Sequence, residues 1–278
     1  MKIRYLGTAA AEGWPAMYCN CDNCKRARAA GGKNIRTRSQ SLINEDLLID
    51  YPADTYSHVL QNNLDLSAVR YCFVTHSHRD HFTPSELLFH DSVCFAHDMK
   101  EREMELYGNE AVAGVYEQCL ETYHGDPERL GIHLHLLEKY KTVEVGRYKI
   151  TPLPAAHAFS ENAFVFLIQE EDKVILYLMD TAVPKDEVFE WLSEHKVRAD
   201  LITYDCTMGI TPTCDVHMGI DMIPQVRKRL EELGVSDEHT ISVLNHFSHN
   251  GVLTYDEMQP LAAEQGFLTA WDGMEIEV

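Results

Sequence analysis

Short apolar runs that end in polar or turn residues recur along the first part of the chain. Residues 2–6, 41–50 and 71–75 are each rich in β-branched, aromatic or leucine residues. Runs of this length and composition predict β-strands. A helix-like stretch follows Pro84.

A second group of predicted strands lies in the middle of the chain. Residues 143–145 and 148–153 flank a turn at Gly146. Residues 163–168 and 174–179 flank a short polar stretch. Because two apolar runs joined by a short polar turn are typical of a β-hairpin, this part of the chain is expected to form antiparallel sheet.

Helix-like and strand-like stretches alternate towards the C-terminus. The spacing of apolar residues predicts helices over 187–195, 217–233 and 255–264, and strands over 199–204, 240–244 and 267–271. In the second of these helices, one face carries the apolar residues Ile223, Val226, Leu230 and Leu233. An amphipathic helix packed on a sheet requires such a face.

The pattern as a whole predicts one α/β domain over residues 1–278. No repeat, low-complexity tract or Pro/Gly/Ser-rich linker supports a domain boundary. We interpret the charged segment at about 98–135 as a helical insertion over the core. Strand-rich halves, each followed by surface helices, suggest two sheets face to face with helices outside them.

Composition limits the kind of partner the protein can have. The chain has 24 Lys and Arg against 44 Asp and Glu, a formal net charge of −20. This charge repels polyanions and argues against a broad nucleic-acid interface, although a small anionic substrate is compatible with it. Every apolar run is shorter than a membrane span, and residues 1–7 are too short and mixed for a signal peptide. We therefore expect a cytoplasmic protein without membrane contacts.

One stretch departs from this acidic balance. Between Cys24 and Ser41 there is no Asp or Glu, and the basic residues are Lys25, Arg26, Arg28, Lys33, Arg36 and Arg38. Such a run is often a solvated basic face. The alternative is that Arg36 or Arg38 steers a phosphate towards a binding site.

The strongest chemical signal follows the apolar run at 71–74 and reads Thr75-His76-Ser77-His78-Arg79-Asp80-His81. Three imidazoles and a carboxylate at the end of a buried strand can converge on a small volume. A lone histidine there would usually be structural, whereas four ligand-type residues in six positions predict a metal site.

This His-x-His-x-Asp-His motif resembles the hallmark of the metallo-β-lactamase superfamily. The resemblance implies a four-layer αββα sandwich that binds two metal ions at one edge of the sheets and hydrolyses esters, amides or phosphodiesters. It also implies a later His, Asp and His at strand ends, and His157, Asp180 and His246 stand at such positions. Each of these alone could be structural, but their order and placement match the family.

The resemblance also assigns the ligands. His76, His78 and His157 would hold one metal ion, Asp80, His81 and His246 the other, and Asp180 would bridge both. Two divalent ions are thus expected, zinc first, with manganese or iron as alternatives. Asp50, at the end of the apolar run 47–49, matches a family position that supports the site from behind.

The cysteines give a second signal. Eight cysteines in a chain with no export signal favour thiols or metal ligands over a disulfide framework. Three of them, Cys19, Cys21 and Cys24, lie within one tight turn, which suits a tetrahedral zinc that needs one more ligand. A redox pair is the alternative, although Cys-x-Cys is cramped for a disulfide.

A second histidine, His249, follows His246 by three residues. Together with the cysteine cluster, it resembles the phosphodiesterase branch of the superfamily that is associated with phosphonate breakdown. That resemblance implies a structural zinc held by Cys19, Cys21, Cys24 and His249, which would join the N-terminal loop to the C-terminal part of the sheet.

His217 stands at the start of the helix predicted over 217–233, where a histidine can be only a helix-start residue. In the resembling phosphodiesterases, a histidine here lies over the metals. The resemblance therefore implies that His217 holds a phosphate oxygen or protonates the leaving alkoxide. We expect His217 and Asp80 to be the catalytic residues.

The sequence thus predicts a binuclear metal-dependent hydrolase, a phosphoric diester hydrolase that cleaves a small phosphodiester, linear or cyclic. Because metal ligands do not tell phosphorus from carbonyl carbon, a lactone or thioester hydrolase of the same fold is an alternative. Another is a protein of quinone-cofactor (pyrroloquinoline quinone) biosynthesis. A redox diiron protein and a metal-stapled binding module are disfavoured by the complete, histidine-rich ligand set. The sequence is compatible with a homodimer.

Overall fold

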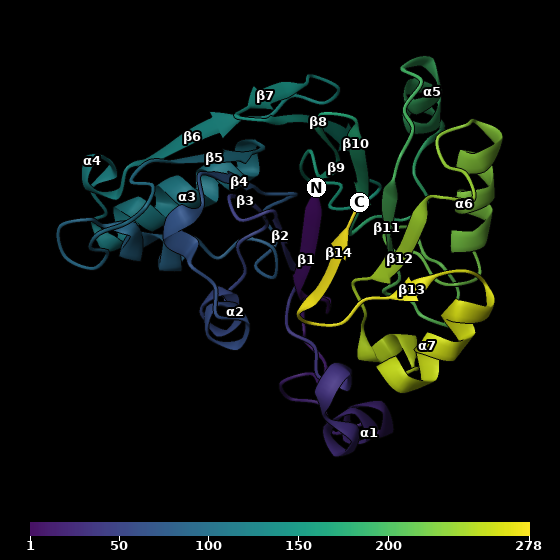
Figure 1. The fold of residues 1–278 in the computed structure, drawn as a ribbon. Coiled ribbons are helices and arrows are strands. Elements are labelled where there is room, and N and C mark those ends of the chain that lie inside the picture. Colours follow the sequence, from purple (N-terminus) through teal and green to yellow (C-terminus); the bar gives the residue numbers. More distant parts are fainter.

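The computed structural model describes residues 1–278 and contains two seven-stranded sheets with helices around them (Figure 1). In spatial order, the first sheet consists of β14 (Met274–Glu277), β1 (Lys2–Gly7), β2 (Gln40–Ile43), β3 (Leu47–Ile49), β4 (Tyr71–Phe73), β5 (Met104–Gly108) and β6 (Ile132–Leu136). The second consists of β13 (Leu268–Thr269), β12 (Ile241–Asn245), β11 (Leu201–Asp205), β10 (Lys173–Leu178), β9 (Phe164–Glu170), β8 (Tyr148–Pro154) and β7 (Val143–Val145).

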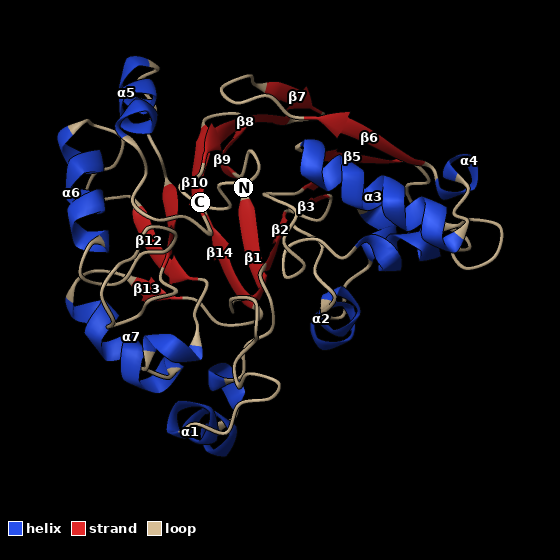
Figure 2. Cartoon of the chain, turned by 180° about the vertical axis from the view of Figure 1, so that it is seen from behind, coloured by secondary structure: helices blue, strands red, loops and turns tan.

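The helices lie outside the two sheets (Figure 2). The α-helices are α1 (Asp22–Ala30), α2 (Thr55–Asn62), α3 (Glu110–Tyr123), α4 (Pro127–Leu130), α5 (Asp186–Glu194), α6 (Ile223–Glu232) and α7 (Tyr255–Glu264). Short 3₁₀ helices are η1 (Gly32–Asn34), η2 (Leu66–Ala68), η3 (Pro84–His90) and η4 (His249–Gly251).

Successive residues of a buried strand point to different cores, because side chains alternate across a sheet. In β10, Ile175 and Tyr177 lie in the core between the two sheets. Leu176 and Leu178 lie in a second core, which also contains apolar residues of α5, α6 and α7. A strand that is covered on both faces is apolar over its buried length, as β10 is from Val174 to Leu178.

A third core covers the outer face of the first sheet. It joins Leu106 of β5 to Val112 and Tyr116 of α3. The layers are therefore helix, sheet, sheet, helix, and the predicted four-layer αββα sandwich is confirmed.

Each sheet is partly antiparallel and partly parallel. In the first, β14, β1, β2 and β3 pair antiparallel, and β3 to β6 pair parallel. In the second, β7 to β10 are antiparallel and β10 to β13 are parallel. Pairing of β1 with β14 brings the two chain ends together (Figure 1). Carboxyl ends of parallel strands meet at one sheet edge, which is where ligand sites form in α/β folds.

The helical insertion predicted at about 98–135 is corrected. This segment does contain α3 and α4, but it begins with β5 and ends with β6, and both strands extend the first sheet. The error arose because exposed histidines and glutamates alternate with the apolar residues of these strands. His133 and His135 of β6 pair with Glu103 and Glu105, so the polar positions form one solvated face of the sheet.

The helix predicted over 217–233 is also corrected, because α6 begins only at Ile223. Pro224, in the first turn, marks this start, since a proline is tolerated there without losing a helical hydrogen bond. His217 thus lies in the loop that precedes the helix. None of the helices is long and apolar enough to cross a membrane.

Candidate metal centre

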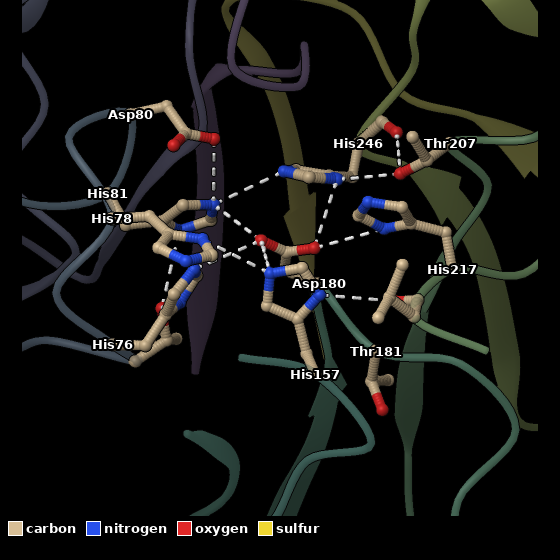
Figure 3. A network of polar contacts seen from close by, with 12 residues as sticks. His76, His78, Asp80, His81, His157, Asp180, Thr181, Thr207, His217 and His246 are labelled. Atoms are coloured by element: carbon tan, nitrogen blue, oxygen red, sulfur yellow. Dashed lines mark hydrogen bonds and ion pairs between the residues drawn. The ribbon is translucent and has the colours of Figure 1, made fainter. Parts of the chain in front are cut away.

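The predicted ligands come together at one edge of the two sheets (Figure 3). They lie on the segments that follow four different strands: His76, His78, Asp80 and His81 after β4, His157 after β8, Asp180 after β10, and His246 after β12. Asp180 is at the centre of the group. Its Oδ2 atom lies 3.3 Å from His76 Nε2, 3.1 Å from His81 Nε2 and 3.3 Å from His157 Nε2.

The chain turns sharply at several of these strand ends. Asp50, Asp180 and His246 have φ values of 66°, 52° and 61°, in the left-handed region. At a residue other than glycine, this conformation costs on the order of 1–3 kcal/mol, and packing must hold it in place. The strained backbone directs these three side chains across the end of the sheets.

Three overlapping groups of side chains around Asp180 can each surround a cation, and the third, Asp180, Asp205, His217 and His246, shares two residues with the second of the two groups that the sequence predicts. Of the two predicted groups, one consists of His76, His78, His157 and Asp180, the other of Asp80, His81, Asp180 and His246, and in each the ligand atoms lie within 4.8 Å of one another. This is the division that the family resemblance implied. The structure brings all seven residues together, while their role as ligands stays a prediction.

Contacts between ring nitrogens show that the groups fit metal ions. His78 Nδ1 lies 3.2 Å from His157 Nε2, and His81 Nε2 lies 3.3 Å from His246 Nε2. His76 Nε2 is buried, and its 3.3 Å contact with Asp180 Oδ2 does not have the geometry of a hydrogen bond. A buried nitrogen without a partner is costly, and imidazole nitrogens that converge with carboxylates form a donor set that suits zinc.

A further layer of contacts fixes the rings. Asp50 Oδ2 lies 2.7 Å from His81 Nδ1, and Asp50 Oδ1 accepts a 2.8 Å hydrogen bond from the Thr75 backbone N–H. The structure thus places Asp50 behind the site, as predicted. Thr207 Oγ1 lies 2.8 Å from His246 Nδ1 and leaves the Nε2 atom of His246 free to face the centre. Such contacts fix the tautomer and orientation of a histidine ligand.

Asp205, the last residue of β11, was missed by the sequence interpretation. It is fully buried, and its Oδ2 atom lies 3.3 Å from His217 Nδ1 and 3.4 Å from His246 Nδ1. The signal was present, because Asp205 ends an apolar strand in the same way that Asp180 follows one.

His217 lies over the centre from its loop. Its Nδ1 atom is 3.1 Å from Asp180 Oδ1, and its ring centroid is 5.0 Å from that of His157. Burial alone lowers the pKa of His217, but its interactions with Asp180 and Asp205 outweigh burial and raise that pKa to about 11. Burial raises the pKa of Asp180, yet the surrounding histidines, His246 first, hold it well below its usual range.

Asp80, the other predicted catalytic residue, is buried beside His81, with 3.4 Å between Asp80 Oδ2 and His81 Nε2. Burial raises the pKa of Asp80, but the neighbouring His81 more than offsets this and keeps the carboxyl ionised. This placement suits a ligand, and a separate catalytic role for Asp80 stays a prediction.

The cysteine cluster forms a second site. The sulfur atoms of Cys19, Cys21 and Cys24 and a ring nitrogen of His249 all lie within 4.8 Å of one another. All eight cysteines are free thiols. The backbone N–H of Cys24 is the main cause that lowers the pKa of the Cys21 thiol, to about 6, which favours the thiolate that binds metal. These residues fit the predicted structural zinc better than a redox pair.

The profile of the family described as "Anti-Pycsar protein Apyc1" matches residues 39–236, well over half of the chain. The chain belongs to this family. A search of curated protein sequences returned no match.

Solved structures share the fold of this Apyc1-family chain. A diphosphatase from the PhnP family superposes with a TM-score of 0.76 at 20% identity, covering 100% of this chain and 97% of the other. The short form of human tRNase Z gives 0.69 at 19%, covering 100% and 99%. Zn(2+)-bound PqqB from Methylobacterium extorquens gives 0.67 at 18%, covering 100% of both chains. At these identities the likeness shows the fold, and the chain has the metallo-β-lactamase fold.

The basic stretch between Cys24 and Ser41 of this Apyc1-family chain was expected to offer Arg36 or Arg38 to a phosphate, and of these two only Arg38 is accessible. Arg36 is 3% exposed, donates hydrogen bonds to Thr8 Oγ1 and the Ala270 carbonyl, and lies over the Phe247 ring. It cannot steer a phosphate, and that expectation is corrected. Arg38 is partly exposed and lines a pocket that shares Ala11 and Glu12 with the pocket of the metal centre.

Proposed function

We propose that the protein is a binuclear metal-dependent phosphodiesterase that cleaves small phosphodiesters. The observation that carries this proposal is the position of Asp180, whose Oδ2 atom lies within 3.3 Å of histidines from both groups. A carboxylate at that point can bridge two cations, and paired cations are typical of enzymes that displace groups at phosphorus. Neighbours named as a diphosphatase and a tRNase also favour phosphate chemistry.

The size of the catalytic pocket supports a small substrate. It has a volume of about 330 Å³ and is lined by most of the predicted ligands together with His217, Thr207 and Asn250. This volume is at the lower end of the range of small-molecule sites. With a net charge of −20, the chain also disfavours a polyanionic substrate. We therefore propose a small anionic diester, linear or cyclic, as the substrate. We also propose that the protein acts in the cytoplasm, as a monomer or a homodimer.

Two divalent cations, zinc in our proposal, would supply Lewis acidity that lowers the pKa of water and neutralises charge on the phosphoryl group. His76, His78, His157 and Asp180 would hold one ion, and Asp80, His81, Asp180 and His246 the other. A third ion, at Cys19, Cys21, Cys24 and His249, would be structural. Zinc with a closed set of thiolate and imidazole ligands is typical of structural sites.

The residues around the pocket provide the remaining chemistry. His217 is held at Nδ1 by Asp180 and Asp205, and its Nε2 atom has no protein partner. In the proposed reaction, the oxygen of water forms a bond to phosphorus, the bond to the leaving alcohol oxygen breaks, and His217 donates a proton to that oxygen. Water loses one proton in this step, which balances the proton that His217 gives. A linear diester yields a phosphomonoester and an alcohol, and a cyclic diester yields one phosphomonoester that carries the freed hydroxyl.

The proposal is tested by measuring metal content and hydrolysis of bis-p-nitrophenyl phosphate in the same preparations. We expect about three metal ions per chain, because the predicted ligands form two groups around Asp180 and the cysteine cluster forms one more. Asp180→Ala should lose diester hydrolysis together with bound metal. His217→Ala should keep its metal and lose most turnover of a diester with an alkyl leaving group, with a smaller loss on bis-p-nitrophenyl phosphate, because p-nitrophenolate leaves without much protonation. The exposed residues Asp172 and His239 provide matched controls, since Asp172→Ala and His239→Ala remove the same side chains outside the site.

Full metal loading without cleavage of the diester would refute the proposal. The same preparations would then be tested on lactones and thioesters. Cleavage of either would assign the protein to the lactone or thioester hydrolases of this fold.

A further inference from the structure

A second pocket opens beside the catalytic pocket. It has a volume of about 690 Å³, and its lining includes Met17, Tyr18, Arg38 and Arg79. Both pockets are lined by Ala11 and Glu12, so they lie side by side and share this wall. A substrate whose phosphorus lies at the metal centre can extend one substituent past this wall into the second pocket.

The backbone of Arg79 lies beside the metal centre because of its place in the chain. It stands between His78, which belongs to one predicted ligand group, and Asp80, which belongs to the other. Its side chain is exposed and forms no ion pair or hydrogen bond with the rest of the protein. An unpaired guanidinium is notable in a chain with 44 acidic and 24 basic residues, where carboxylates are abundant.

Arg38 adds a second guanidinium to the same pocket. Its Nε atom donates a 2.8 Å hydrogen bond to the carbonyl of Ala11, and its Nη1 atom donates a 3.0 Å hydrogen bond to Asp54 Oδ2. These contacts hold the side chain against the wall that separates the two pockets. Its Nη2 atom has no protein partner and is available to a ligand.

The acidic residue of the pocket, Glu12, is already engaged. It accepts a hydrogen bond from Ser248 Oγ, and its Oε1 atom lies 3.6 Å from His249 Nε2. Its charge is thus directed towards Ser248 and His249. Glu12 keeps its negative charge and Arg38 is ion-paired with Asp54, so Arg79 is the guanidinium of the pocket that has no carboxylate partner. Guanidinium groups bind carboxylates and phosphates in a fork-like geometry.

We propose that this second pocket binds a second anionic group of the substrate, a carboxylate or a terminal phosphate, distinct from the phosphate that is cleaved. The proposal rests on the proposed phosphodiesterase function and narrows its substrate class to diesters that carry a further anion. The anionic substituent is the one that stays on phosphorus, because Arg79 adjoins Asp80, whereas His217, which protonates the leaving group, lies across the centre from Asp80 (Figure 3). The exposed Met17 and Tyr18 would contact the organic part of this substituent.

The test uses three p-nitrophenyl phosphodiesters that differ only at the end of an alkyl arm, which carries a carboxylate, a phosphate or a neutral carboxamide. In each probe, the oxygen of water bonds to phosphorus, p-nitrophenolate leaves, and the arm stays on phosphorus. Wild-type protein should cleave the better anionic probe with a kcat/KM about tenfold or more above that of the carboxamide probe, mainly through KM, since charge-assisted hydrogen bonds contribute on this scale. The order of the two anionic probes identifies the terminal group that the pocket prefers.

Arg79→Gln should reduce this ratio to near one, and Arg79→Lys should keep part of it, because lysine retains the charge but not the fork. Arg102, which is exposed and lies outside the pocket, provides the matched control, and Arg102→Gln should leave the ratio unchanged. Metal content is measured for each variant, because Arg79 adjoins the predicted ligands. High ionic strength should also lower the ratio by screening the charges.

The two proposals fail in different ways. Cleavage of bis-p-nitrophenyl phosphate without any preference for the anionic arms, or with a preference that survives in Arg79→Gln, overturns the anion pocket and leaves the phosphodiesterase standing. Failure to cleave any diester overturns the phosphodiesterase, and the anion pocket is rejected with it.

Discussion

The carboxylate of Asp205 holds both the ring and the backbone around His217. Its Oδ2 atom lies 3.3 Å from His217 Nδ1, and its Oδ1 atom accepts a 3.1 Å hydrogen bond from the backbone N–H of Met218. Asp205 is itself held at the end of β11, where its oxygens also accept hydrogen bonds from the Thr207 backbone and hydroxyl. A loop histidine is thereby given a fixed ring orientation, with Nε2 directed away from its support.

We expect Asp205→Asn to lower kcat by roughly 10²-fold, since an amide cannot stabilise the protonated ring that general acid catalysis needs. The loss should be greater for an alkyl leaving group than for p-nitrophenolate, which leaves without much protonation. Metal content should stay near the wild-type value, because Thr207 still contacts His246 Nδ1 at 2.8 Å. Loss of one metal ion per chain would instead show that Asp205 acts through His246 and not through His217.

Asp50 should control metal affinity and not the chemical step. It contacts His81 Nδ1 at 2.7 Å and is fully buried, so replacing its carboxylate removes the acceptor that orients this ring. We expect Asp50→Asn to weaken metal binding by roughly 10–100-fold, as is usual for residues that orient a ligand. Competition with a chelator measures this affinity, and the exposed Asp172→Asn is the control. Equal affinities in the two variants would contradict the prediction.

The convergence of the candidate ligands could be predicted from the sequence because the pattern that marks each of them is local. Each candidate ligand stands at the end of an apolar strand. Strand ends at one sheet edge lie close together irrespective of the length and sequence of the loops between them. Asp205 has the same local signature, and it was missed because no motif drew attention to it. The position of His217 in a loop was misjudged because the apolar face that begins at Ile223 was extended backwards past Pro224.

Other features depend on tertiary contacts that local patterns do not reveal. The five residues of β6 alternate apolar and histidine side chains, and only the pairing with β5 makes them a strand of the sheet. Arg36 is one of several basic residues in its segment, and its burial is decided by Thr8, Ala270 and Phe247, which are distant from it in the chain. Charge and composition alone could not separate it from Arg38, which is partly exposed.

Glu161 should position the loop that carries two of the ligands. Its carboxylate accepts hydrogen bonds from the Ser77 backbone (3.0 Å), the Ser77 hydroxyl (2.7 Å) and Asn109 Nδ2 (2.7 Å). Ser77 lies between His76 and His78, so these bonds fix the direction of both rings. Glu161→Ala is expected to lower diester hydrolysis at limiting metal by roughly tenfold or more.

Excess metal should restore most of this activity, because the ligands themselves are intact. Glu161→Gln should be milder, since one amide oxygen can still accept from Ser77. Activity measured against metal concentration separates this role from a catalytic one. A loss in Glu161→Ala that no concentration of metal reverses would contradict the positioning role.

The cysteine site should stabilise the fold through its metal, because it joins segments far apart in the chain. Cys21 caps α1, and its sulfur lies 3.5 Å from His249 Nδ1, while Asn23 donates a 2.7 Å hydrogen bond to the His249 carbonyl. If zinc holds this site at concentrations well above its Kd, losing it removes roughly 2–3 kcal/mol of stability. Cys21→Ser should therefore lose one metal ion per chain and lower Tm by on the order of 5–10 °C.

The exposed thiol of Cys94 lies outside the cluster, and Cys94→Ser should change neither quantity. Since His249 is three residues from His246, Cys21→Ser should also weaken metal binding at the catalytic centre. If Cys21→Ser changes neither the metal count nor Tm, the cluster binds no structural metal.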